Sequence, residues 1–181
     1  MNISDLLFDK SNSNAISEFA DNFGVNESQA KDAISSLAKS LTRGLGENTQ
    51  DVKGLDSLMD ALERGKHSRY LDEPSVLGRE ETRQDGNDIL GHIFGNKDVS
   101  RHVAKRASKE TGLGSSLLKK MLPVVATMVM GSLGKKMLGG GGRRTSRQES
   151  TGILTQLFDR DKDGSMVDDV LGMAFKAFMA R

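Results

Sequence analysis

The stretch from Leu117 to Leu138, with the sequence LLKKMLPVVATMVMGSLGKKML, constrains the fold more than any other part of the chain. Apolar residues recur in it at the spacing of one helical face, and further apolar residues fall off that face. The middle of this helix is therefore apolar nearly all round, which is typical of a helix at the centre of a core or in lipid. The remaining segments are short and amphipathic, as expected of helices that pack around it.

The length of the charge-free run separates a core helix from a membrane helix. The run extends only from Met121 to Gly134, with a pair of lysines on each side, whereas a bilayer span needs about 20 apolar residues. Pro123 also removes one backbone donor and favours a kink or a new helix start. We therefore expect a core helix and no transmembrane segment, with membrane contact as the less favoured alternative.

The composition fits one cytoplasmic domain with appendages. The 181 residues include no cysteine, which excludes disulfides and thiolate metal sites. Apolar residues make up 36% of the chain and aromatic residues only 4%, so a core must consist largely of aliphatic side chains. Residues 1–10 lack both a basic start and an apolar h-region, so we expect no secretory signal and a cytoplasmic location.

Helical periodicity predicts an all-α fold, a small helical bundle in residues 1–138, and strands have almost no support. Residues 66–87, with Pro74, Gly78 and many charges, are expected to be an irregular connection that is disordered, packed by its few apolar residues, or functional. Seven helices are expected. The first three are residues 3–8, a segment from the Ser-Asn run at 11–14 to Gly24, and a segment that an Asn26–Gln29 capping box opens and Gly44 and Gly46 end. The other four are a segment from Leu55 that stops at Gly65, one capped by Asp88, one from Asp98 to Gly112, and the central helix from about Ser115.

The two halves of this domain share a pattern. A shift of 88 residues places Gly24 on Gly112, and it places three leucines of the earlier long helix on apolar residues of the central helix. Residues 3–46 and 89–134 are therefore candidates for two pseudo-repeated helical units. The alternative is a chance coincidence between two amphipathic helices.

Residues 139–150 form a Gly/Arg linker, and residues 151–181 are predicted to form a C-terminal helix-loop-helix tail. The apolar face of the tail is too large to leave in water, so we expect it to dock on its own core or on a neighbouring chain. The Asp-rich loop at 159–169 matches the opening of a calcium loop, but Val170 stands where the closing Glu is needed. The alternative is an acidic turn that caps the next helix and binds calcium weakly or not at all. The candidate calcium ligands are Asp159, Asp161, Asp163, Ser165 and Asp169.

Two elements of the sequence carry a family resemblance. The element ILGHIFG at residues 89–95 and the apolar helix that begins with KKMLP resemble the bacterial domain-of-unknown-function family DUF937 and its YidB-like relatives. The resemblance extends over nearly the whole chain, and a tail of the type LFDRDKDGSMVDD commonly follows the linker in such proteins. It implies an all-helical bacterial domain and brings no catalytic residues.

Charge is strongly segregated along the chain. Residues 101–150 hold eleven Lys or Arg and two Asp or Glu, although the net charge of the whole chain is only +1. This basic region, residues 101–147, is a candidate surface for nucleic acid or acidic lipid. Nucleic-acid sites usually combine positive charge with a reading helix or with aromatic side chains that stack on bases, and this region contains no aromatic residue. A solvated helix face is therefore favoured over a nucleic-acid site. The candidate anion-binding residues are Arg101, Lys105, Arg106 and Lys109.

The sequence contains no nucleophile elbow, phosphate loop or obvious carboxylate dyad, so we expect no enzyme and no cofactor other than calcium. His92 lacks a second ligand at helical spacing and is expected to be half-buried and hydrogen-bonded. The favoured function is a non-enzymatic interaction module with a protein partner or with self-association through the flexible methionines of the central helix. The alternatives are the anion-binding protein and a calcium-responsive module.

Overall fold

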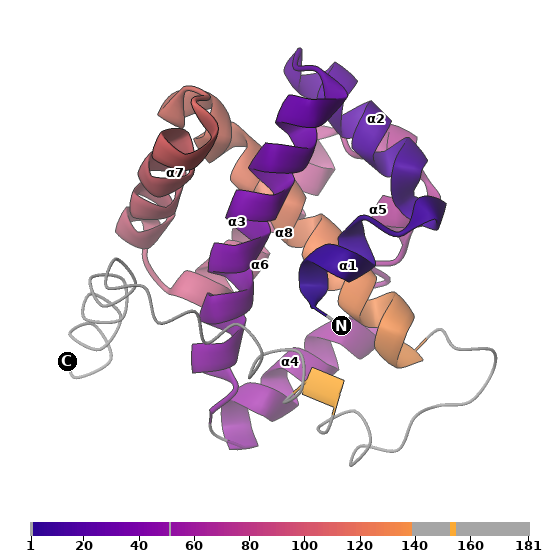
Figure 1. The fold of residues 1–181 in the computed structure, drawn as a ribbon. Helices are drawn as coiled ribbons and strands as arrows, with labels where there is room; N and C mark the ends of the chain where they lie inside the picture. Colours follow the sequence, from indigo (N-terminus) through magenta and orange to yellow (C-terminus); the bar gives the residue numbers. More distant parts are fainter. Residues whose placement is uncertain (1, 51, 139–152, 155–181) are drawn as a thin grey trace.

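Eight α-helices make up most of the part of the chain that the structure describes, which is residues 2–50, 52–138 and 153–154 of a computed structural model (Figure 1). The described residues contain no strand, so the all-α prediction is confirmed. The elements are α1 (Ile3–Leu7), η1 (Lys10–Asn12), α2 (Ser13–Phe23), α3 (Glu27–Asn48), α4 (Val52–Arg64), α5 (Arg69–Asp72), η2 (Pro74–Val76), α6 (Glu80–Phe94), α7 (Lys97–Thr111) and α8 (Ser115–Leu138).

The central helix of the sequence is α8, which crosses the middle of the molecule (Figure 1). The helices α1, α3, α4, α5, α6 and α7 all pack on it. Every residue from Met121 to Gly134 is buried, and the helix continues through Pro123, so of the two expectations there, a kink or a new helix start, the new start is wrong. By length and composition, Ser115–Met137 is also the one stretch of the described chain that could cross a membrane, and 83% of its most apolar window is buried inside the domain.

Burial of α8 changes the role expected for its methionines. Met121, Met128, Met130 and Met137 are each at most 2% exposed, so they fill the core. The prediction that they form an adaptable surface is therefore wrong. An unbranched side chain suits this position because it fills irregular gaps between several helices.

Glycine allows two helix crossings that the sequence did not reveal. The helix α3 continues through Gly44, which was expected to end it, because this glycine packs against α6. A Cβ on Gly44 would lie 2.6 Å from Ile93 Cγ2 and 2.7 Å from Phe94 Cε1. Gly86 of α6 similarly faces the carbonyl oxygen of Pro123 in α8. Both glycines are therefore points of close helix approach.

Residues 66–87 were expected to be an irregular connection, but most of them are helical. They contain α5, η2 and the first turns of α6, and the segment is anchored by buried Tyr70, Leu71 and Leu77. Asp88, expected to cap a helix, lies inside α6. The few apolar residues of a charged segment were sufficient to fix it on the core, which is one of the three outcomes expected for a connection of this length.

Most of the predicted helix boundaries agree with the structure. The Asn26–Gln29 capping box is present, and Gly24 and Gly112 end their helices with φ of 65° and 75°, a left-handed conformation that favours glycine. The capping residue of α7 is Asn96 and not Asp98. Gly24 and Gly112 correspond under the shift of 88 residues, but the internal repeat itself stays a prediction.

Candidate functional site

A groove of about 570 Å³ lies between the last turns of α3, the helix α4 and the last turns of α6; we call it the α4 groove. Polar residues form the rim, among them Lys53, Ser57, Asp60 and His92. The floor consists of the apolar side chains of Leu45, Leu58, Ile89, Ile93 and Met130. An apolar floor within a polar rim is the usual construction of a binding site in a protein.

The groove exists because α4 is attached to the domain along one side. Its buried residues Leu58, Met59 and Leu62 occupy one face of the helix, and its main contact is with α8. The end of α3 reaches α6 instead, where the side-chain amide of Asn48 donates to the carbonyl oxygen of His92 at 2.5 Å. The two attachments leave a groove between them, and the side chains of its floor are each at most 9% exposed.

His92 stands at the rim of the α4 groove and is exposed, not half-buried as expected. The expected hydrogen bond is present, because the Nδ1 atom lies 2.7 Å from the carbonyl oxygen of Asp88. One ring nitrogen is thereby engaged with the backbone of α6. The other ring nitrogen, Nε2, is the one left for a partner.

The chain returns to the domain after the linker. Leu154 is 1% exposed and belongs to the same core cluster as Leu58, Met59 and Leu62, while Ile153 is half-buried against that cluster. The rest of the predicted tail lies outside the described residues, including the whole Asp-rich loop with Asp159, Asp161, Asp163, Ser165 and Asp169. Docking of the tail as a whole therefore stays a prediction.

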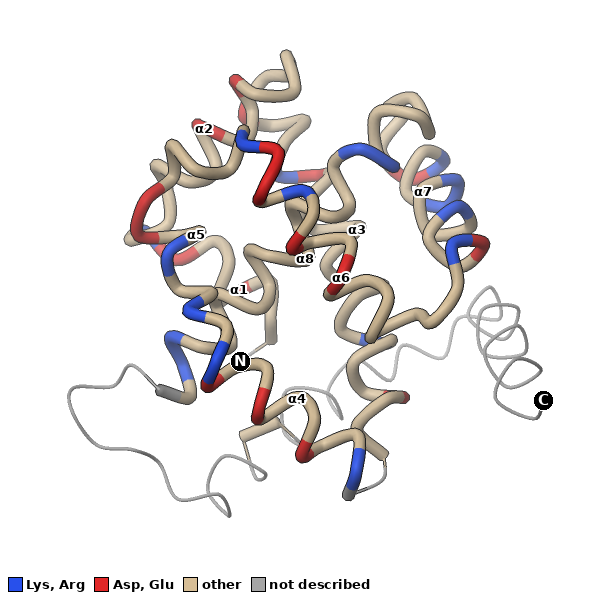
Figure 2. Tube along the Cα trace, turned by 180° about the vertical axis from the view of Figure 1, so that it is seen from behind, with Lys and Arg blue, Asp and Glu red and all other residues tan. Residues whose placement is uncertain are grey.

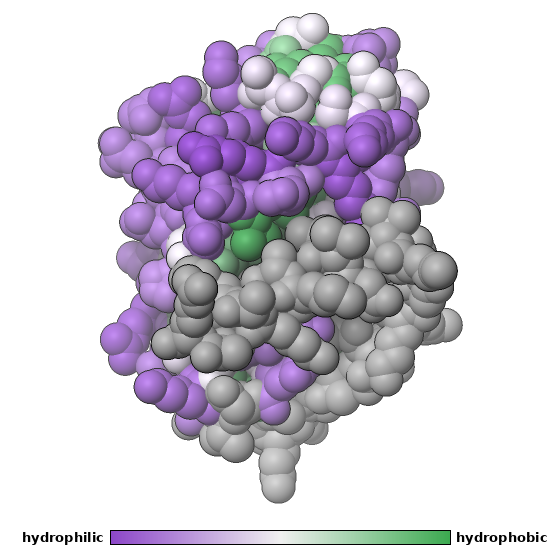
Figure 3. Space-filling model, turned by 90° about the vertical axis from the view of Figure 1, so that its left-hand side faces the viewer, coloured by the Kyte–Doolittle hydropathy of each residue, from purple (hydrophilic) through white to green (hydrophobic). Residues whose placement is uncertain are grey.

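The basic residues expected to bind anions divide into two groups. Arg101, Lys105 and Lys109 are exposed along one side of α7, where Figure 2 shows Lys and Arg gathering. The space-filling view from this side shows a belt of hydrophilic residues (Figure 3). Arg106 instead is half-buried and ion-paired with Glu110 at 2.9 Å. Arg106 therefore belongs to the packing of the helix and not to the exposed row.

Glu110 links α7 to α3. Its carboxylate accepts a hydrogen bond from the Ser36 hydroxyl at 2.5 Å and another from Arg106 Nε at 2.9 Å. Partial burial raises the pKa of Glu110, but the hydrogen bonds from Ser36 and Arg106 outweigh it, and the net pKa lies below the ordinary glutamate value. The charged side chain of Glu110 therefore helps to hold α7 against α3.

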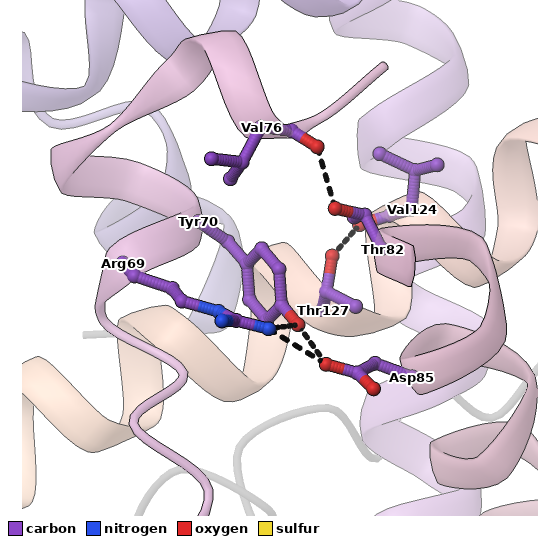
Figure 4. Close-up of polar contacts among 7 residues, drawn as sticks. All are labelled: Arg69, Tyr70, Val76, Thr82, Asp85, Val124 and Thr127. Atoms are coloured by element: carbon purple, nitrogen blue, oxygen red, sulfur yellow. Dashed lines mark hydrogen bonds and ion pairs between the residues drawn. The ribbon is translucent and has the colours of Figure 1, made fainter. Parts of the chain in front are cut away.

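A second polar cluster joins α5 to α6 (Figure 4). The Tyr70 hydroxyl donates to the Asp85 carboxylate, and the Arg69 guanidinium donates to Tyr70 at 2.8 Å and to Asp85 at 3.0 Å. Burial raises the pKa of Tyr70. Thr82 of α6 also donates to the carbonyl oxygen of Val76 at 2.5 Å. The cluster fixes the segment that was expected to be irregular.

His67 packs beside this cluster, with its ring stacked on Tyr70 at 6.2 Å between centroids. Burial lowers the pKa of His67, and the nearby Asp85 opposes that shift only in part. The Nδ1 atom is buried and has no hydrogen-bond partner. Burial therefore favours the neutral imidazole over the charged one at this position.

Metal ligation has no prepared site in the described ranges, which contain no group of three His, Cys, Asp or Glu residues able to hold an ion. Sequence reasoning missed the α4 groove because its floor comes from four helices separated along the chain. The only local signal was the strong one-sided pattern of α4, which appeared as an ordinary amphipathic helix.

A comparison with known families gives the wider relationship of this domain. The family described as bacterial protein of unknown function (DUF937) matches residues 5–136. That range contains all the residues of the α4 groove and the exposed row on α7. No curated protein and no solved structure matches the chain. Because the family match covers well over half of the sequence, the chain belongs to the bacterial family DUF937.

Proposed function

We propose that this domain is a non-enzymatic interaction module that binds an amphipathic helix in the α4 groove. The groove is the observation that carries the proposal, because it is formed in the folded domain and combines an apolar floor with a polar rim. Amphipathic helices bind such grooves through apolar residues three and four positions apart, and their polar face stays in water. Its volume of about 570 Å³ is within the range of preformed binding sites.

The resident occupant that we propose is the chain's own C-terminal segment, residues 155–181. Burial of Leu154 anchors the chain to the domain at the residue where this segment begins. Burying a large apolar side chain is worth about 1.5–3 kcal/mol, so the segment gains stability from a groove that is within reach. Its apolar residues include Leu157, Phe158, Val170, Leu171, Phe175 and Phe178.

A partner helix of the same character would bind by displacing this segment. The same segment supplied by a second copy would produce self-association through an identical contact. Binding energy in either case comes from the floor residues, while the rim fixes the orientation of the helix. The proposal therefore places the interaction mainly on α3, α4 and α6, and Met130 is the α8 methionine that contributes to the floor.

A titration tests the proposal. A fluorescent peptide of residues 151–181 is added to a chain that ends at Gly140 and to the full chain, and anisotropy reports binding. We expect saturable binding to the shortened chain and weaker apparent binding to the full chain, whose own segment competes. The variant Ala61→Trp fills the groove from the exposed side of α4 and should weaken binding by at least about tenfold.

Glu63→Trp is the matched control. It places the same indole on the same helix at an exposed residue that does not line the α4 groove, and peptide affinity should stay unchanged. Equal losses in Ala61→Trp and Glu63→Trp, or no peptide binding to either chain length, would reject the groove as the docking site. Sedimentation of the full chain over a range of concentrations separates docking within one chain from docking between two copies.

A further inference from the structure

A second hollow lies where the end of α6, the start of α7 and the first turns of α8 meet; we call it the α7 pocket. Its volume is about 510 Å³. The apolar residues Leu90 and Leu122 form its floor. Its polar lining residues are Asn87, Asn96, Lys97, Ser100, Arg101 and Lys119.

The lining of the α7 pocket is positively charged. Three cations face it from two helices, and no Asp or Glu lines it. Arg101 is paired with Asp98 at 2.7 Å, whereas Lys97 and Lys119 have no ion pair with any residue in the described ranges. Like charges that converge on one hollow repel each other, and an anion bound among them would relieve that repulsion.

The other lining groups suit an oxyanion with an organic part. The side-chain oxygen of Asn96 accepts from the backbone N–H of Asp98, which leaves its amide hydrogens to donate. The amide of Asn87 and the hydroxyl of Ser100 are further donors at the wall. Convergent polar groups over an apolar floor are the arrangement by which pockets of this size orient small ligands.

We infer that the α7 pocket binds a phosphate monoester, an activity that lies beyond the proposed helix binding. The phosphate lies among Lys97, Arg101 and Lys119, and the organic group lies on Leu90 and Leu122. A phosphate dianion matches the charges of Lys97 and Lys119, which have no ion pair within the described part of the chain, whereas a single carboxylate would leave one of them uncompensated. The ester is either a soluble molecule or the head group of a phosphatidic acid.

The test uses the full chain, with inorganic phosphate and phenyl phosphate as ligands in calorimetry at low salt. Phenyl phosphate should bind more tightly by at least about tenfold, because its ring reaches the apolar floor. Amide resonances of Gly91 and Gly95, which line the α7 pocket, should shift during the titration. Lys119→Glu should weaken phenyl phosphate binding by at least about tenfold.

Lys120→Glu supplies the matched control, since it makes the same charge change at the next exposed residue of α8, outside the pocket. Its affinity for phenyl phosphate should stay within about twofold of the native value. Equal losses in the two variants would assign binding to general positive charge and overturn the site, as would no binding by the native chain. Binding to phosphatidic acid vesicles that Lys119→Glu alone removes would support the site and identify a lipid head group as the source.

Discussion

Gly86 lies at a close approach of α6 to α8, and it offers a direct test of the packing. A Cβ at this residue would meet the carbonyl oxygen of Pro123 at 2.1 Å and the Pro123 Cβ at 2.7 Å. Contacts of a real Cβ are essentially never shorter than 3.0 Å, so Gly86→Ala forces the helices apart by about 1 Å. Pro123 O belongs to the backbone of the central helix and cannot rotate away as a flexible side chain would.

Two opposing terms set the size of this effect. Overpacking of this kind costs about 1–3 kcal/mol or more, and the better helix propensity of alanine offsets about 1 kcal/mol of it. Because the added Cβ meets backbone that cannot rotate away, we take the upper end of the overpacking cost, about 3 kcal/mol, and expect a net loss of about 2 kcal/mol in the free energy of unfolding. That is a large part of the stability of a typical domain, which is about 5–15 kcal/mol.

Urea unfolding followed by circular dichroism measures the change, with Gly91→Ala as the control. Gly91 lies on the same helix, and an added Cβ there would have no atom within 4 Å. Gly91→Ala should therefore stabilise the domain by about 0.5–1 kcal/mol. A Gly86→Ala protein as stable as Gly91→Ala would refute the close approach of α6 and α8.

Two further predictions concern the polar contacts. Ser36→Ala should lower the free energy of unfolding by about 1 kcal/mol, less than the loss of a fully buried bond to a charge, because Glu110 is partly exposed. Since the folded-state pKa of Glu110 is lowered, this contribution is present above the ordinary glutamate pKa and is lost as pH falls through the folded-state pKa. The urea midpoints of the native protein and Ser36→Ala should therefore converge in acid. His67→Gln should flatten the pH dependence of stability below the ordinary histidine pKa. Because the pKa of His67 is lowered in the folded state, the unfolded chain takes up the proton first, and the native protein loses stability as pH falls through that range. Equal slopes of unfolding free energy against pH in the two proteins, measured by urea unfolding, would contradict this.

The sequence predicted those parts of the fold that depend on local chemistry. The capping box at Asn26, the left-handed glycines Gly24 and Gly112 and the burial of the central helix all follow from residue type and spacing. The helix end predicted at Gly44 was wrong. A glycine within a helical pattern can either end the helix or allow another helix to pack closely, and here the neighbouring helix α6 decides between the two. Local pattern carries no information about that neighbour.

The same difference between local pattern and tertiary packing explains which residues of the candidate sites could be predicted from the sequence. Arg101, Lys105 and Lys109 were visible because they repeat every four residues on one helix. Lys119 was missed as a partner of Arg101, since the two are brought together only by the packing of α7 on α8. The floor of the α4 groove is hidden in the sequence for the same reason, because core residues and groove residues share one apolar pattern.

Paramagnetic broadening tests most directly whether the C-terminal segment occupies the α4 groove, as we propose. The chain has no cysteine, so Lys176→Cys provides a single site for a nitroxide label, 22 residues beyond buried Leu154. Methyl resonances of Ile89, Ile93 and Met130 should broaden, while that of Ile16 on α2, at the opposite end of the molecule from α4 (Figure 1), should not. Broadening of the groove methyls no greater than that of Ile16 would contradict the account.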